Sequence, residues 1–239
     1  MEHFNKILVI PDVHGRTFWK GSVDGTYEHI VFLGDYLDPY PFELITVRKA
    51  YANFQEIIEY KKQHAGRVTL LLGNHDMHYC SELFYDLAGG SRYNSMMAPE
   101  FGQTFEEEKE LFQLAYEAEV GAQHYLFTHA GVNRSWYQRH QEVVGPLDAE
   151  HLNHLLDTDE GIRAIADVGR SRGGWETTGG PMWADVSEMY FAPHFSEYYQ
   201  IIGHSQQAKD PIIEDSFACL DCRRAFVISD KGIHPLKEK

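Results

Sequence analysis

The segment HIVFLGDYLD, residues 29–38, joins a short apolar run to two acidic side chains. His29 to Leu33 has the length and the branched, aromatic content of a buried strand, and Asp35 and Asp38 follow it directly. Four further runs of this kind also end in polar residues, and they are Lys6 to Ile10 before PDVHG, Arg67 to Leu72 before GNHD, His124 to Thr128 before HAG, and Tyr198 to Ile202 before GHS. Strands of this length separated by helical stretches indicate an α/β fold.

The segments between and after these runs complete the predicted organisation. Helices are predicted over Phe42 to His64 and Phe101 to Glu119, with the glutamates of the second on a solvated face, and one or two more over residues 148–168. The Gly-rich residues 169–181 are predicted to form a loop over a site. Short strands at 217–220, 225–229 and 232–236 are expected to be antiparallel and to close a second sheet. The sequence has no repeat or linker, so we predict a single domain, residues 1–239, with a helical and loop section around 133–185.

Composition excludes several classes of protein. The 239 residues are 43% hydrophobic, so the chain can bury a core and is not a disordered acidic protein. A net charge of −15 argues against nucleic acid and anionic membranes as partners, because both require a positive surface. The polar start of the chain lacks a signal pattern, and its three cysteines suit a reducing compartment. A cytoplasmic location is therefore expected.

The polar residues that follow the five runs have the chemistry of metal ligands. Ligands in open α/β sheets bind beyond the carboxyl ends of strands, so these five ends are expected to converge. Carboxylate oxygen with imidazole nitrogen suits Mn, Fe, Zn or Ni better than calcium. Asp35 is the natural bridge between two ions, since a carboxylate has two oxygens. The candidate ligands are Asp12 and His14 for one ion, Asn74, His129 and His204 for the other, and Asp35 for both.

A pair of divalent ions predicts a reaction. Two ions about 3.5–4 Å apart polarise a phosphoryl oxygen and lower the pKa of bound water, which generates hydroxide near neutral pH. The prediction is hydrolysis of a phosphate ester by a metal-bound hydroxide. One such motif alone often arises by chance or as turn chemistry after a strand, but five in this order, each after its own strand, do not.

From Asp12 to His204 the sequence resembles the calcineurin-like metallophosphoesterase superfamily, whose ordered signature consists of these five elements. Asp38 and the stretch PMWAD, residues 181–185, make it most similar to the phosphoprotein phosphatase branch and its bacterial relatives. The resemblance implies a four-layer sandwich of two mixed β-sheets flanked by helices. It also implies that His75 acts as a general acid and that Asp38 orients it and keeps it protonated.

The sequence departs from the branch at the position that grips phosphate. The branch has an arginine directly after the second aspartate of Gly-Asp-x-x-Asp, and this chain has Pro39 there. Pro11 and Asp76 also replace the more usual Gly and Glu. The phosphate-binding role must therefore be reassigned, and the candidates are Arg172, Arg170 and Arg134, with Arg172 favoured by its Gly-rich loop.

Three functions follow as hypotheses. The first is a dimetal phosphomonoesterase, with Mn as the favoured metal and a phosphorylated protein or small molecule as substrate, in the manner of a serine/threonine protein phosphatase. The second is a pyrophosphohydrolase of bis-nucleoside polyphosphates, in which Tyr36, Tyr40, Trp175 or Trp183 stacks on a base. The third is a catalytically silent metal-bound scaffold, which the retention of His75 and Asp38 disfavours.

Overall fold

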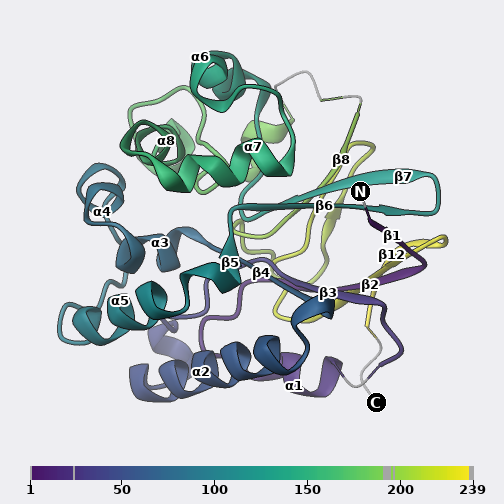
Figure 1. Ribbon diagram of the computed structural model, residues 1–239, viewed down its shortest axis with the longest axis horizontal. Coiled ribbons are helices and arrows are strands. Elements are labelled where there is room, and N and C mark those ends of the chain that lie inside the picture. The colour runs from purple at the N-terminus through teal and green to yellow at the C-terminus, as the bar shows by residue number, and fades with distance from the viewer. Residues whose placement is uncertain (1, 24, 191–194, 196, 237–239) are drawn as a thin grey trace.

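The computed structural model describes residues 2–23, 25–190, 195 and 197–236, and within these ranges the strands form two mixed six-stranded sheets (Figure 1). The strands of the first sheet, in spatial order, are β12 (Gly232–Pro235), β11 (Phe226–Ser229), β2 (Lys6–Ile10), β3 (His29–Phe32), β4 (Val68–Leu71) and β5 (Phe112–Gln113). Those of the second are β1 (Glu2–Phe4), β6 (Ala115–Val120), β7 (Gln123–Thr128), β8 (Tyr199–Ile202), β10 (Phe217–Cys219) and β9 (Ile212–Ile213).

Helices cover the outer side of each sheet, as Figure 1 shows: α1 and α2 lie beyond the first sheet, and α6, α7 and α8 lie beyond the second. The α-helices are α1 (Phe18–Ser22), α2 (Val47–Gln63), α3 (Asn74–Cys80), α4 (Glu82–Ala88), α5 (Ala98–Glu107), α6 (Arg134–Val144), α7 (Ala149–His154), α8 (Asp159–Ile165) and α9 (Val186–Met189). This arrangement confirms the predicted α/β sandwich of two mixed sheets with flanking helices. No helix of the described residues is long and apolar enough to cross a membrane.

Alternation along the strands explains the layers. Ile7 and Val9 of β2 pack with residues of the second sheet, including Phe127, in a core between the two sheets. Their neighbours Leu8 and Ile10 belong to the core that includes the helices. Successive side chains of a strand point to opposite faces, so a strand that is apolar at every position fits a layer buried on both sides.

The five predicted strands preceding the polar motifs are confirmed as β2, β3, β4, β7 and β8, with ends within one residue of those expected. The first three belong to one sheet and the last two to the other. Parallel pairing of β2 with β3, β3 with β4, and β7 with β8 places the carboxyl ends of each group at one edge. The motifs after these strands therefore come from both sheets.

The predicted helix over Phe101 to Glu119 is wrong in its second half. Helix α5 ends at Glu107, a short 3₁₀ turn follows at Lys109–Leu111, and residues 115–120 form β6. The run of glutamates predicts a solvated helix face, but residues 112–120 are all buried or half-buried and leave no exposed face, which suits a strand within a sheet. The helix predicted from Phe42 begins later, at Val47, because Thr46 caps it by accepting from the Lys49 amide.

The C-terminal strands are confirmed in position, and β11 and β12 pair antiparallel as predicted, but the three strands do not lie in one sheet. β10 pairs parallel with β8 in the second sheet, while β11 and β12 extend the first sheet antiparallel to β2. The C-terminal region therefore contributes to both sheets rather than closing one. Helices α7 and α8 confirm the helical prediction for residues 148–168, and residues 169–181 contain a 3₁₀ turn, Arg170–Arg172, and an isolated β-bridge between Gly169 and Glu176.

Candidate metal centre

Three predicted ligands of the second ion gather where β4, β7 and β8 end. Nε2 of His129 lies 3.0 Å from Oδ1 of Asn74 and 3.2 Å from Nδ1 of His204, which is itself 3.0 Å from Asn74 Oδ1. Nδ1 of His129 is 2.7 Å from the Leu33 carbonyl, so in the neutral ring this nitrogen carries the proton and Nε2 keeps its lone pair. The three side chains therefore present acceptor atoms to one another.

Asp35 lies between this group and His14. Its Oδ2 is 3.3 Å from Nε2 of His14 and 3.6 Å from Nε2 of His129. Nδ1 of His14 contacts the Leu37 carbonyl at 2.8 Å, so a neutral His14 also turns a lone pair toward Asp35. One carboxylate oxygen thus faces ligand atoms from both predicted sets, as the bridging role requires.

The chemistry of these residues fits a pair of cations. All of these side chains are buried. With Nδ1 of His129 as the donor to Leu33, only His204 Nδ1 can supply a proton to the hydrogen bonds among Asn74, His129 and His204. Burial lowers the pKa of His14 and His204 well below the usual value, so both rings are neutral and able to coordinate. Burial alone would raise the pKa of Asp35, but the surrounding histidines, chiefly His129, outweigh it and lower the pKa.

Asp12 lies next to this group. Both of its oxygens accept from the backbone amide of His204, at 3.0 and 3.1 Å, and burial raises the pKa of its carboxyl. The contact requires glycine at position 203, because a Cβ there would lie 2.1 Å from Asp12 Oδ1. Among the described residues, the sets of possible metal ligands whose ligand atoms all lie within 4.8 Å of one another do not include Asp12. Metal coordination by Asp12 therefore stays a prediction.

Strained backbone marks the centre. His14, Asp35, Asp38 and His204 have positive φ angles of 45°, 54°, 55° and 62°. Such angles are costly for residues with a side chain and persist where the surrounding structure enforces them, often at functional sites. Asp76 contributes to this enforcement at the start of α3, because its carboxylate accepts from the backbone amides of Asp35, Tyr36 and Gly73.

His75 and Asp38 form the predicted pair. Nδ1 of His75 lies 2.9 Å from Oδ2 of Asp38, and both side chains are buried. Sequence reasoning missed Tyr79, whose hydroxyl donates to the other oxygen of Asp38 at 2.6 Å. Burial, followed by the charge of Asp38, raises the pKa of Tyr79, so this hydroxyl keeps its proton. The spacing of Tyr79 from His75 on one helix was the available signal, since residues four apart share a face.

The three predicted arginines are placed differently. Arg172 reaches the rim of the centre: its Nη2 lies 2.6 Å from Ser205 Oγ and its Nε 2.8 Å from Asp185 Oδ2. Arg170 is exposed in the same 3₁₀ turn. Arg134 begins α6, with its guanidinium over the ring of Phe195. The structure thus brings only Arg172 of the three into contact with residues of the His204 motif.

Sequence reasoning missed Arg92, which lies at the centre itself. Its Nη2 is 3.1 Å from Nε2 of His75 and 3.4 Å from Nε2 of His14, and its Nε donates to the Asp38 carbonyl at 3.0 Å. The residue follows the helix α4 rather than a strand, so it lacks the signal that marked the five motifs. The preceding Gly-Gly-Ser was the only local indication of a functional loop.

Most of the aromatic residues predicted to stack on a base already pack against other side chains of the protein. Tyr36 is fully buried, stacks on Phe54 and donates its hydroxyl to the Leu71 carbonyl, which excludes it from substrate contact in this structure. Tyr40 lies beneath the Arg92 guanidinium. Trp183 packs between His78 and His204, and Trp175 is 93% exposed in the Gly-rich loop.

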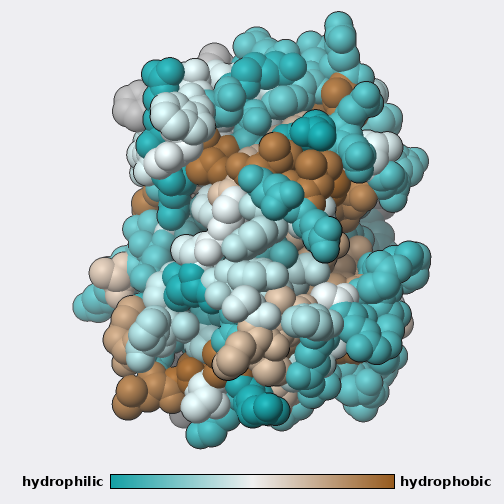
Figure 2. All heavy atoms as spheres, turned by 90° about the vertical axis from the view of Figure 1, so that its left-hand side faces the viewer, coloured by the Kyte–Doolittle hydropathy of each residue, from teal (hydrophilic) through white to brown (hydrophobic). Residues whose placement is uncertain are grey.

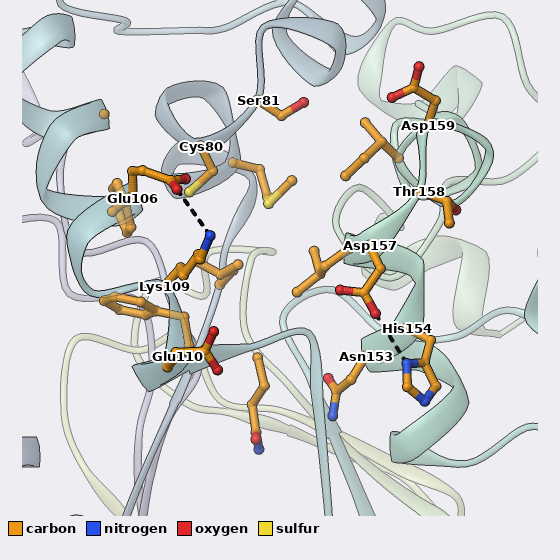
Figure 3. A pocket seen from close by; sticks show the side chains of 18 residues that line it. Cys80, Ser81, Glu106, Lys109, Glu110, Asn153, His154, Asp157, Thr158 and Asp159 are labelled. Carbon is orange, nitrogen blue, oxygen red and sulfur yellow. Dashed lines mark hydrogen bonds and ion pairs between the residues drawn. The ribbon is translucent and has the colours of Figure 1, made fainter.

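A large cleft lies away from the metal centre. Its volume is about 760 Å³, and α3, α5 and the α7–α8 region line it (Figure 3). Acidic residues surround it, but Glu106 is paired with Lys109 and Asp157 with His154, as the dashed lines show. Figure 2 views the molecule from the side of α4 and α5, where apolar side chains gather in a band across the upper half and in a second group at the lower left of a largely hydrophilic face. No predicted site residue lines the cleft.

Comparison with known proteins finds a family match and similarities to solved structures. Residues 5–204 match the family model described as calcineurin-like phosphoesterase. The chain is similar in fold to a cold-active protein tyrosine phosphatase, with a TM-score of 0.58 and 16% identity over 99% of this chain and 80% of the other. It also matches a Saccharomyces cerevisiae serine/threonine phosphatase similar to human phosphatase PP5, with a TM-score of 0.49 and 14% identity over 100% of this chain and 84% of the other. No curated protein matches the chain in sequence.

The matched range includes all five motifs and covers most of the sequence. The chain belongs to the calcineurin-like phosphoesterase family, and it is accordingly a phosphoesterase with buried His and Asp groups able to hold metal.

Proposed function

We propose that this phosphoesterase hydrolyses phosphate monoesters with two divalent ions, Mn being the favoured metal, and that phosphorylated proteins are among its substrates. The observation that carries the proposal is the position of Asp35 Oδ2, 3.3 Å from His14 Nε2 and 3.6 Å from His129 Nε2. A buried carboxylate oxygen between two sets of imidazoles fits a shared ligand of two cations. The chain's three cysteines are free, which supports a reducing, cytoplasmic compartment.

The residues of the two sets would hold the ions, which when bound polarise a phosphoryl oxygen and lower the pKa of water. The protein itself fixes the ligand atoms before any ion binds. The Leu33 and Leu37 carbonyls accept from Nδ1 of His129 and His14, so the Nε2 atoms of both rings point inward. Hydrogen bonds of this kind set the tautomer and orientation of coordinating histidines.

His75 is proposed to protonate the leaving alkoxide. With Nδ1 bound to Asp38, the ring presents Nε2 toward His14 and the centre. Asp38 fixes the orientation of the ring, and Tyr79 in turn fixes the carboxylate of Asp38. His75 and Tyr79 lie on successive turns of helix α3, and their shared contact with Asp38 orients His75 as a general acid.

A substrate panel tests the function. Metal-stripped protein is reloaded separately with Mn, Fe, Zn and Ni and assayed on p-nitrophenyl phosphate, a phosphoserine peptide and diadenosine tetraphosphate. We expect turnover of the two monoesters only after metal is restored, fastest with Mn. Faster turnover of diadenosine tetraphosphate would instead support a pyrophosphohydrolase. Absence of turnover with every metal and every substrate would indicate a silent metal-binding scaffold and overturn the proposal.

A further inference from the structure

Arg92 contacts His14 and His75 at the metal centre, although it lies outside every motif that predicted the centre. It is half-buried and belongs to the segment between α4 and α5. Its φ angle is +60°, an unfavourable value for a residue with a long side chain. The backbone is therefore held in a strained conformation that delivers the guanidinium to His14 and His75, and such strain is typical of functional positions.

The charge of Arg92 has no anionic partner in this arrangement. None of the ion pairs between described residues includes Arg92, whereas Arg172 is paired with Asp185 and Arg16 with Glu43. The guanidinium lies 3.9 Å from the centroid of the Tyr40 ring, which holds a cation in place without neutralising it. A positioned guanidinium with its charge uncompensated is suited to binding an anion.

The present partners of Nη2 are also replaceable. A guanidinium only donates, so the Nε2 atoms of His14 and His75 accept from it, and both rings carry their proton on Nδ1. In the proposed centre His14 Nε2 would hold a metal ion and could then not accept from Arg92. Nη2 would then have a donor available for another acceptor, while Nε remains anchored on the Asp38 carbonyl.

We propose that Arg92 binds the terminal oxygens of the substrate's phosphoryl group and makes the centre select monoesters over diesters. A monoester dianion has three terminal oxygens, and a diester has two and one fewer negative charge. Loss of a guanidinium therefore removes more binding from the monoester. The neighbouring turn offers no substitute, since Pro39 has neither a side-chain nor a backbone donor. This inference rests on the proposed function, because the selection of monoesters requires that the centre hydrolyse them.

The test compares Arg92→Ala and Arg92→Lys with the exposed control Arg163→Ala in the metal-loaded full chain. Initial rates are measured on p-nitrophenyl phosphate and on bis-p-nitrophenyl phosphate, and binding of inorganic phosphate is measured by calorimetry. We expect Arg92→Ala to lower kcat/KM for the monoester roughly 10–100-fold, to change the diester by less than about threefold, and to weaken phosphate binding at least about tenfold. Arg92→Lys should be intermediate, because lysine keeps the charge without the planar fork.

Separate results decide the inference and the proposed function. Equal losses on both esters, or phosphate binding that Arg92→Ala leaves unchanged, would overturn the role of Arg92, as would a wild-type protein that binds no phosphate. Metal content and circular dichroism confirm that the variants are loaded and folded. If the wild type turns over no ester but binds phosphate through Arg92, the proposed function fails, and the phosphate-binding role of Arg92 stands without its role in selecting monoesters.

Discussion

The imidazole of His75 donates from Nδ1 to Oδ2 of Asp38 across 2.9 Å, in a pair buried beside the metal centre. The two residues come from different strand-end motifs, after β4 and after β3. The tautomer of His75 is therefore set by a contact between segments that are 37 residues apart. A ring oriented in this way can transfer a proton only through Nε2.

His75→Asn is expected to lower kcat by about 10²–10⁴-fold, the usual contribution of a general acid, while both metals stay bound. The loss should be greater on phenyl phosphate than on p-nitrophenyl phosphate, because the poorer leaving group needs the proton more. Asp38→Asn should cause a smaller loss of the same kind, since it disturbs the orientation of His75 without removing the ring. Steady-state kinetics with metal analysis measure both effects, with exposed His154→Asn as the control. Loss of metal in His75→Asn would show that the residue is a ligand instead.

Asp35→Asn is expected to release both ions together. Its Oδ2 faces His14 Nε2 at 3.3 Å and His129 Nε2 at 3.6 Å, so the substitution weakens both sets of ligands. Changes even outside the direct ligands cost about 10–100-fold in metal affinity, so removing a shared ligand should cost at least that much. Metal content is measured after gel filtration, beside the exposed variant Asp230→Asn. If one ion remains at full occupancy, Asp35 does not bridge the two.

Stability should fall as the pH drops below neutral, partly through His29. Burial lowers the pKa of His29 to about 4, against 6.5 for the unfolded chain. Between these values the unfolded state binds the proton and the folded state does not, so the free energy of unfolding decreases as pH falls from 6.5 to 4. At about 1.4 kcal/mol per pH unit, His29 accounts for roughly 2 kcal/mol between pH 6.5 and pH 5.

His29→Gln isolates this effect, because glutamine does not titrate and can still contact Thr69, which His29 Nε2 meets at 2.9 Å. Urea unfolding at pH 7.5 and pH 5 gives the measurement. The variant should lose less stability between the two pH values than the wild type, and the exposed His234→Gln should lose as much as the wild type. Identical losses in His29→Gln and the wild type would contradict the buried, neutral state of His29.

Local patterns predicted much of the fold because each strand is followed immediately by its polar residues. Runs such as His29 to Leu33 are apolar at every position, which is the pattern of strands buried on both faces, and all five were found as strands. The helix predicted over residues 101–119 is wrong beyond Glu107, because the acidic residues at the end of α5 continue toward β6 and that strand is only six residues long. Pairing of β10 with β8 was not predictable, since it depends on contacts between distant segments.

At the centre, residues that follow strands were predictable and those from other segments were not. Asp35, Asn74, His129 and His204 follow strands, so their convergence was foreseen, and the structure brings them within hydrogen-bond range or close to it. Arg92 reaches the centre from a loop after a helix, and its position depends on a positive φ angle that the sequence does not reveal for an arginine. Long side chains from loops can reach a site from many places, so sequence spacing identifies them poorly.

Arg172 is predicted to assist phosphate binding from the other rim of the centre. Its Nη2 lies 2.6 Å from Ser205 Oγ and 3.4 Å from the His204 carbonyl, next to a predicted ligand. Its Nε is 2.8 Å from Asp185 Oδ2, so part of its charge is already neutralised. A charged hydrogen bond contributes roughly 1.5–3 kcal/mol, which corresponds to about 10–100-fold in kcat/KM. Because Arg172 is already paired with Asp185, we expect its contribution at the lower end of this range. Arg172→Ala and Arg172→Lys should both raise KM for a monoester and lower kcat/KM about tenfold, with metal content unchanged.

The exposed neighbour Arg170 supplies the matched comparison, because Arg170→Ala changes the same 3₁₀ turn and should have a smaller effect. Asp185→Asn adds a second check on the mechanism. If Asp185 offsets the charge that Arg172 offers to phosphate, this variant should tighten phosphate binding in calorimetry, and the gain should vanish when Arg172 is alanine as well. Monoester hydrolysis by Arg172→Ala at the wild-type rate and KM would exclude Arg172 from substrate binding and leave Arg92 as the arginine that binds the phosphoryl group.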